Sequence, residues 1–170
     1  HKILARQLFD IKKEQHLKTK IHQLTSINDS TSNAVKEQYE QNPYPRWINP
    51  GLFHNPKTIR ENLHAINPQL SIDDNHYSKM PNILIAGCGT GQHALNSQSR
   101  FLNCTVLAID LSLNSLSYAM RKTHELSITN INYQQADILE LQTIDLQFDV
   151  IESVGVLHHL RDPLEGWRIL

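Results

Sequence analysis

The chain has few cysteines, few glycines and no long apolar run. Its 170 residues contain two Cys, six Gly and only 6% aromatic residues. Two cysteines, Cys88 and Cys104, are too few for a disulfide-stabilised scaffold or a cysteine-based zinc site, which favours a reduced, cytoplasmic protein. The longest apolar runs, such as 83–86 and 106–109, are far shorter than the roughly 20 residues that span a bilayer. With no signal-like N-terminus, we expect no membrane insertion.

The chain also lacks an excess of either charge. It contains 16 Lys and Arg against 17 Asp and Glu, and its net charge is -1. Proteins that bind mainly nucleic acid usually have a large positive excess, so the composition disfavours such a partner. The lysines at 12, 13, 18 and 20 are expected to form a solvated helix face. The chain starts and stops inside predicted helices and has no initiator Met, so we expect a piece of a longer protein.

Residues 1–79 predict a helical arm. Apolar residues recur every three to four positions from Lys2 to Leu24, which indicates an amphipathic helix. A polar linker over 25–33 is expected to end in the N-cap of a second helix over 34–41. The prolines of Asn42-Pro43-Tyr44-Pro45 then favour an extended segment as far as Pro50. A further short helix is expected over 56–66.

Residues 80–170 predict a second, different architecture. Short apolar segments alternate there with helical ones, which is typical of a parallel sheet with crossover helices. We therefore expect an α/β domain. The four predicted strands cover 82–86, 104–109, 131–135 and 148–153; helices are expected over 92–99, over 113–126 with Ser112 as its cap, and from Asp162-Pro163 onward.

A glycine-rich loop connects the first of these strands to its helix. The residues are Gly87-Cys88-Gly89-Thr90-Gly91. Glycine lets a backbone pass close to a ligand, and the free N–H groups of the following helix can bind a polar or anionic group. A tight turn without a ligand also favours glycine, so the loop alone does not prove a binding site.

Two carboxylates are expected at the same edge of the sheet. Asp110 ends the second strand, where an acidic residue can accept both hydroxyls of a ribose. Asp137 follows the third strand, where it could accept the amine of a purine beside Ile138. Either aspartate could instead be an ordinary charge at a helix start.

The loop is also compatible with NAD. The segment 89–94 satisfies the dinucleotide-binding pattern, so spacing does not decide between nucleotide cofactors. Residues 83–96 contain no Lys or Arg to balance a pyrophosphate, which disfavours NAD. The phosphate-binding loop of ATP and GTP hydrolases is absent.

Four ordered segments resemble the motifs of class I S-adenosylmethionine-dependent methyltransferases. They are Ile83 to Gly91, Asp110-Leu111-Ser112, Gln135-Ala136-Asp137-Ile138 and Phe148-Asp149-Val150-Ile151. The resemblance implies a Rossmann-like doubly wound parallel sheet, truncated to about four strands in the order 3-2-1-4, and S-adenosyl-L-methionine as the cofactor. The cofactor-binding residues that it implies are Gly87, Cys88, Gly89, Gly91, Asp110, Leu111, Asp137, Ile138, Glu152 and Ser153.

A further segment, Tyr39 to Trp47, resembles a motif that precedes the catalytic domain in bacterial methyltransferases with tetratricopeptide repeats. Its aromatic side chains could form a lid over the cofactor, because aromatic faces attract a sulfonium cation. Alternatively, Tyr44 and Trp47 merely pack the arm onto the sheet.

The resemblance implies methyl transfer by direct displacement to an unidentified acceptor, a protein or a small molecule. Ser153, His159 and Tyr44 are the candidate catalytic residues, and no metal site is expected. The alternatives are an NAD-binding oxidoreductase and a methyltransferase-like interaction module without turnover. The fourth predicted strand would form an exposed apolar edge, where we expect a partner or self-association.

Overall fold

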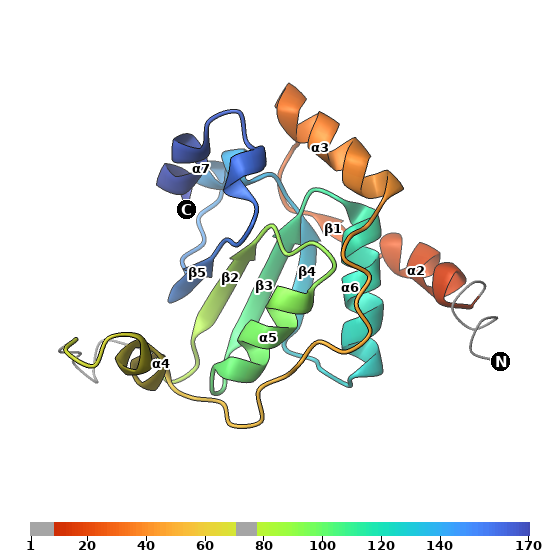
Figure 1. The fold of residues 1–170 in the computed structure, drawn as a ribbon. Coiled ribbons are helices and arrows are strands. Elements are labelled where there is room, and N and C mark those ends of the chain that lie inside the picture. The colour runs from red at the N-terminus through yellow and green to blue at the C-terminus, as the bar shows by residue number, and fades with distance from the viewer. Residues whose placement is uncertain (1–8, 71–77) are drawn as a thin grey trace.

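The computed structural model describes residues 9–70 and 78–170. Its centre is a five-stranded sheet in which every pair of neighbouring strands is parallel (Figure 1). The strand order is β1-β4-β3-β2-β5. The predicted α/β, Rossmann-like class and the 3-2-1-4 order of the four predicted strands are confirmed. The strands are β1 (His22–Gln23), β2 (Asn82–Ala86), β3 (Thr105–Asp110), β4 (Ile131–Gln135) and β5 (Val150–Glu152).

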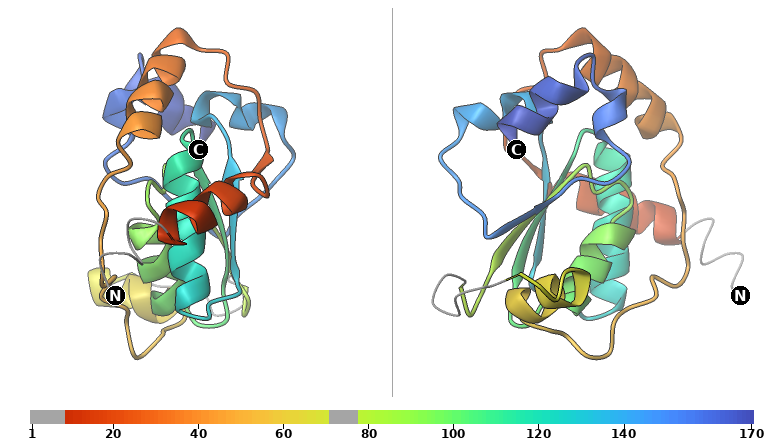
Figure 2. Two further views of the ribbon diagram at one scale, coloured as in Figure 1. Left: turned by 90° about the vertical axis from the view of Figure 1, so that its right-hand side faces the viewer. Right: turned by 60° about the vertical axis from the view of Figure 1, so that its left-hand side comes forward.

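Helices cover both faces of the sheet. Ile83 and Ile85 of β2 pack into one apolar cluster, whereas Leu84 and Ala86 pack into another on the opposite face. A strand buried on both sides explains the uninterrupted apolar run that the sequence shows there. Figure 2 shows α5 and α6 together on one side of the twisted sheet. The helices are α5 (Gln92–Arg100) and α6 (Leu113–Glu125) on that side, and η3 (Ile138–Thr143), η4 (Leu157–His159) and α7 (Pro163–Ile169) against the other cluster.

The N-terminal arm differs from its prediction. The helix expected over Lys2–Leu24 lies partly outside the described residues, and its described part, α2 (Asp10–Lys18), ends before Leu24. Residues 22–23 instead form strand β1, which pairs with β4, and the N–H of Leu24 donates to Gln135 O at 2.7 Å. The edge of β4 offers unpaired backbone groups, and pairing with them outweighs the helical pattern of this segment.

The second arm helix, α3, begins earlier than predicted. It covers Ser30–Gln41, and the Asp29 carboxylate caps it by accepting the N–H groups of Thr31 and Ser32. The polar residues predicted as a linker therefore include its cap and first turn. The third helix, α4 (Ile59–Ile66), begins at Ile59 rather than at Pro56. Thr58 is its N-cap and forms a capping box with Glu61. The predicted caps Ser112 and Asp162 are confirmed.

The described part of the arm is fixed to α6. Arg121, which is 5% exposed, donates to Glu14 of α2 at 2.9 Å and also pairs with Glu125. Glu40 of α3 accepts the N–H of Leu113, a free donor of the first turn of α6, at 2.6 Å. The domain boundary expected between residues 79 and 80 stays a prediction. Strand β1, which precedes that boundary, belongs to the same sheet as the strands that follow it.

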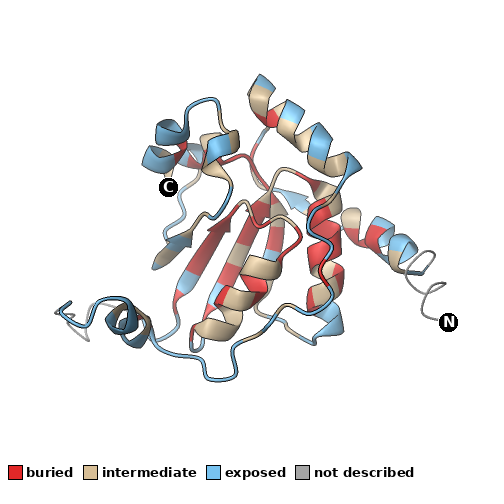
Figure 3. Ribbon diagram, viewed as in Figure 1, coloured by how far each residue is buried: buried red, intermediate tan, exposed pale blue. Residues whose placement is uncertain are grey.

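Burial is concentrated in the central strands and in α5 and α6, whereas α4 and α7 are largely exposed and α3 has mostly exposed and intermediate residues (Figure 3). Strand β5 forms one edge of the described sheet, and Ile151 on it is exposed. Among the helices of residues 9–70 and 78–170, none has the length and apolar character needed to cross a membrane.

Candidate functional site

A pocket of about 760 Å³ lies at the carboxyl ends of β2, β3 and β4. In Figure 1 this end of the sheet lies below α3 and beside η4 and α7. Parallel strands direct their carboxyl ends to one edge, which is where open α/β sheets bind ligands. Of the predicted cofactor residues, the pocket wall contains Gly87, Cys88, Gly89, Asp110, Leu111, Asp137 and Ile138, and of the catalytic candidates it contains Tyr44 and His159.

The glycine loop owes its shape to backbone contacts with the neighbouring strand. The N–H groups of Gly87 and Cys88 both donate to Ile109 O, at 2.9 and 2.8 Å. The N–H of Gly89 donates to the Asp110 carboxylate at 2.8 Å. Gly89 has a φ of 52°, in the left-handed region, and an added Cβ would meet only Tyr44 O at 3.8 Å. The loop therefore presents bare backbone to the pocket.

Gly91 has a different role from the other loop glycines. It does not line the pocket but caps α5 with a φ of 84°. An added Cβ would lie 2.5 Å from the Cβ of Ala119 and 3.0 Å from the Tyr133 hydroxyl. The structure thus shows Gly91 at the contact between the loop and α6, a distinction that the sequence pattern did not reveal.

Asp110 joins the loop to α6 and still has hydrogen-bonding capacity. Its Oδ2 accepts from Gly89 and its Oδ1 accepts the N–H of Ser112 at 2.9 Å. Burial raises its pKa, and the N–H groups of Ser112 and Gly89 oppose this rise. Each carboxylate oxygen has two lone pairs, so both oxygens can accept a further hydrogen bond from a ligand hydroxyl.

Asp137 carries an unsatisfied oxygen. The side chain is 1% exposed, and its Oδ1 accepts the N–H of Leu139 at 3.0 Å. Its Oδ2 and the hydroxyl of Ser32 on α3 are both buried and form no hydrogen bond of normal geometry, although Ser32 interacts with the Asp137 side chain closely enough to lower its pKa. Burial raises the pKa of Asp137, while Ser32 and the N–H of Leu139 lower it. A buried carboxylate oxygen without a well-aligned donor is costly, and a ligand can supply one.

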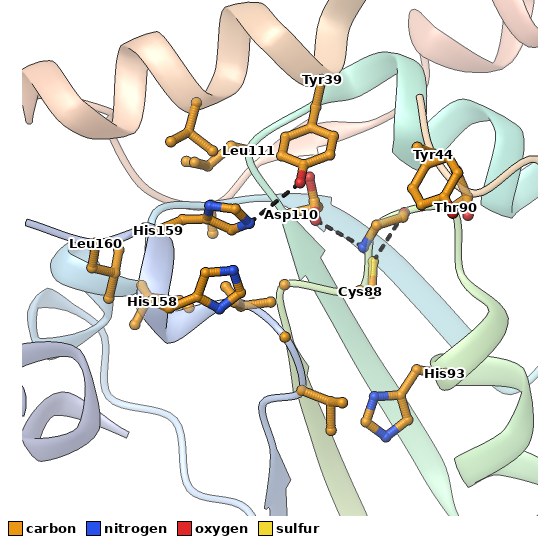
Figure 4. A pocket seen from close by; sticks show the side chains of 18 of the residues that line it. Tyr39, Tyr44, Cys88, Thr90, His93, Asp110, Leu111, His158, His159 and Leu160 are labelled. Carbon is orange, nitrogen blue, oxygen red and sulfur yellow. Dashed lines mark hydrogen bonds between the residues drawn. The ribbon is translucent and has the colours of Figure 1, made fainter. Parts of the chain in front are cut away.

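Helix α3 covers the pocket, whereas from the sequence a covering role is expected only for the segment Tyr39 to Trp47, of which Tyr39 belongs to this helix. Ser32, Val35 and Tyr39 line the pocket from this helix. The Tyr39 hydroxyl lies 3.3 Å from Nε2 of His159 on η4 (Figure 4). Burial lowers the pKa of His159, as does the neighbouring His158. For Ser32 and Val35 the side-chain pattern of α3 contained no signal for this role, because the cover depends on contacts between distant segments.

The aromatic segment of the arm has the packing role considered for it, and its role as a lid stays a prediction. Trp47 is 7% exposed, and its Nε1 donates to Thr90 O at 3.0 Å. The Thr90 hydroxyl donates in turn to Pro45 O at 2.5 Å. Tyr44, by contrast, is 74% exposed and lines the pocket. Trp47 therefore packs the arm onto the glycine loop, whereas Tyr44 remains available to a ligand.

Two predicted cofactor residues lie elsewhere. Glu152 and Ser153 are not among the residues that line the pocket. Glu152 accepts hydrogen bonds from Ser97, from Arg100 and, at 2.9 Å, from His93, all on α5. The Ser153 hydroxyl is buried without a partner. His93 does line the pocket, and no sequence motif had singled it out.

Cys88 is not suited to nucleophilic catalysis. It is 6% exposed, and burial raises its pKa well above its ordinary value, as does the charge of Asp110. A thiol that stays protonated is a poor nucleophile. Its place in the loop is therefore a packing position beside the pocket.

Comparison with known proteins agrees with this geometry. A family model described as a methyltransferase domain matches residues 83–167. Trans-aconitate 2-methyltransferase of Deinococcus radiodurans is 31% identical over 114 residues, which make up 67% of this chain and 40% of that protein. An uncharacterized protein of Synechococcus sp. is 29% identical over 153 residues, covering 85% of this chain and 35% of its own length.

Solved structures share the fold. Phosphoethanolamine N-methyltransferase 2 of Haemonchus contortus, solved with S-adenosyl-L-methionine, superimposes with a TM-score of 0.53 at 21% identity. The match covers 79% of this chain and 31% of that one. The chain thus spans well under half the length of these relatives.

Proposed function

Since the chain belongs to the class I S-adenosylmethionine-dependent methyltransferases, we propose that its pocket binds S-adenosylmethionine for methyl transfer by direct displacement to an acceptor. When bound, this cofactor supplies an electrophilic methyl group on a sulfonium. The protein's own contribution is to align the acceptor and to exclude water. No covalent intermediate on the enzyme is required, which agrees with the unreactive Cys88.

The unsatisfied Oδ2 of Asp137 carries this proposal. A purine amine would supply the well-aligned donor that neither Ser32 nor any other described residue gives this buried oxygen, and Ile138 would pack beside the ring. Asp110 would accept the ribose hydroxyls with its remaining lone pairs. Gly87 and Gly89 would let the rest of the cofactor lie against the backbone of the loop.

The charge of the pocket also favours a sulfonium cofactor over a dinucleotide. Asp110 and Asp137 both line it, whereas none of the described residues in its wall is Lys or Arg. Carboxylates attract a cation and repel a pyrophosphate. This distribution supports S-adenosylmethionine and opposes the NAD alternative.

Tyr44 and Val154 are exposed residues of the pocket wall, and we expect the acceptor to contact at least one of them. Tyr44 is suited to contact an acceptor or the sulfonium with its exposed ring. His159 already contacts Tyr39, and Ser153 lies outside the wall, so each would need a rearrangement to contact an acceptor.

Calorimetric titration with S-adenosylhomocysteine, S-inosylhomocysteine and NAD tests the proposal. The inosyl compound replaces the amine donor with a carbonyl acceptor. A hydrogen bond to a charged group is worth about 1.5–3 kcal/mol, so we expect the adenosyl compound to bind roughly 10- to 100-fold more tightly. Asp137→Asn should erase this preference, because an amide can donate to the carbonyl.

Asp145→Asn is the matched control, because Asp145 is exposed and lies outside the pocket. It should leave both affinities unchanged. Binding of NAD alone would refute the proposal, and so would an unaltered preference in Asp137→Asn.

A further inference from the structure

A histidine and a carboxylate form a pair at the wall of the pocket. His93 lies in the first turn of α5 and lines the pocket, and its Nε2 is 2.9 Å from Oε2 of Glu152 at the end of β5. The His93 side chain is 28% exposed and that of Glu152 is 18% exposed. Ser97 donates to the same oxygen, Oε2, and Arg100 donates to Oε1. The pair therefore combines a fixed anion with a ring that a ligand can reach.

The ionisation of Glu152 determines which ring nitrogen carries the proton. Burial raises its pKa, but hydrogen bonds from His93 and Ser97 and the charge of Arg100 outweigh this and leave the pKa below its ordinary value. An ionised carboxylate only accepts hydrogen bonds, so Nε2 of His93 must be the donor. In the neutral ring, Nδ1 is then an unprotonated acceptor. No described residue forms a hydrogen bond with Nδ1.

The pair lies away from the residues proposed to hold the adenosyl part. In Figure 4, His93 is separated by the loop at Cys88 from Asp110, Tyr39 and His159. Asp110 and Asp137 are proposed to hold the adenosyl part, which leaves the part of the pocket beside His93 for the methionine part of the cofactor and for the acceptor. An acceptor entering there would meet a proton acceptor held by a carboxylate.

We propose that His93 is the general base for a neutral hydroxyl acceptor and that Glu152 is the residue that positions it. The inference rests on the proposed methyl transfer. The acceptor oxygen forms its bond to the methyl carbon as the carbon–sulfur bond breaks, with that electron pair remaining on sulfur. The O–H proton passes to Nδ1 of His93, and the resulting imidazolium lies against the Glu152 carboxylate.

The chemistry of the wall identifies the class of acceptor. A hydroxyl is a weak nucleophile that gains from losing its proton during attack, whereas a neutral amine already offers a lone pair. A carboxylate or phosphate acceptor would need a cationic partner, and the described wall contains no Lys or Arg. The exposed Tyr44 and Val154 add apolar surface. These features fit an uncharged hydroxyl compound with an apolar body.

Nitrogen-15 NMR of the histidine side chains, on protein saturated with S-adenosylhomocysteine, tests the inference. We expect His93 to show a protonated Nε2 and an unprotonated Nδ1. Addition of 4-methylphenol should shift the Nδ1 resonance, because its hydroxyl donates there. The methyl ether of the same compound lacks the proton and should leave the resonance in place.

Two variants separate a positioning role from a structural one. Glu152→Gln should mix the two tautomers of His93 and reduce the shift caused by 4-methylphenol. Ser97→Ala removes another donor to the same carboxylate but should leave the His93 tautomer unchanged. If Ser97→Ala mixed the tautomers as Glu152→Gln does, the proposed role of Glu152 would be wrong.

The experiment gives different results if His93 is not the base and if the pocket does not bind the cofactor. If the wild-type protein binds S-adenosylhomocysteine but Nδ1 carries the proton, or 4-methylphenol causes no shift, His93 is not the base. If S-adenosylhomocysteine itself does not bind, the proposed function is overturned, and the inference that rests on it falls with it.

Discussion

Replacement of Gly91 by alanine is expected to destabilise the protein more than replacement of Gly51 by alanine. Both glycines have a left-handed φ, but only Gly91 is closely surrounded by other atoms. Gly91 has a φ of 84°, and its added Cβ would lie 2.5 Å from the Ala119 Cβ. Neither β-carbon can rotate away, because each is fixed directly to the backbone. Gly51 has a φ of 70°, yet an added Cβ would meet nothing within 4 Å. The pair of variants therefore separates packing from backbone strain.

The expected magnitudes follow from these two terms. A left-handed φ costs a residue with a side chain about 1–2 kcal/mol, and this is the whole cost expected for Gly51→Ala. Overpacking against α6 adds about 1–3 kcal/mol, so Gly91→Ala should lose about 2–5 kcal/mol. Because a domain of this kind is stable by about 5–15 kcal/mol, the variant should fold but with a clearly lower midpoint.

Urea unfolding followed by circular dichroism measures this difference, and calorimetry with S-adenosylhomocysteine completes the comparison. Gly89→Ala is the informative third variant, because its Cβ would contact only Tyr44 O, at 3.8 Å, beside the pocket. It should resemble Gly51→Ala in stability but lose ligand affinity. If Gly91→Ala were as stable as Gly51→Ala, the assignment of Gly91 to packing would be refuted.

Two further predictions concern the carboxylates and the arm. Burial raises the pKa of Asp137, so binding of S-adenosylhomocysteine should weaken on acidification at a higher pH than an ordinary carboxyl titrates. The unliganded protein should gain stability in the same pH range, because protonation of a carboxyl with a raised pKa favours the folded state; Asp137→Asn should abolish both effects in calorimetry and urea unfolding. Arg121→Leu should lower the free energy of unfolding by about 3 kcal/mol, because buried Glu14 loses its closest cation. The double variant Arg121→Leu, Glu14→Gln should regain part of the free energy of unfolding in urea. If it regained none, the loss of the ion pair would not be the cause of the destabilisation.

The predictable part of the fold is the part in which local signals agree. Strand β4 and the caps Ser112 and Asp162 were predicted from periodicity and capping residues. These signals are local, since the apolar pattern and the cap lie within a few residues of each other. Strand β1 could not be predicted in this way, because a two-residue strand exists only through its pairing with β4.

The candidate site shows the same division. The glycine loop, Asp110 and Asp137 each follow a recognisable strand, so their convergence could be inferred from the parallel order. The cover by α3 could not, because it depends on the bond between Glu40 and Leu113, 73 residues apart in the chain. Neither could the role of Gly91, which depends on the position of Ala119 in α6.

Glu152 illustrates why a motif alone does not determine what a side chain contacts. The family resemblance implied that Glu152, near the end of the fourth predicted strand, contacts the cofactor, but its carboxylate turns toward His93 and Arg100 on α5. A buried carboxylate needs cationic or hydrogen-bonding partners, and α5 supplies both within reach of the end of β5. Glu152 would thus act on the ligand through His93 rather than by contact. The NMR comparison of Glu152→Gln with Ser97→Ala tests this distinction directly, because only an indirect role predicts that the first variant alone alters the His93 tautomer.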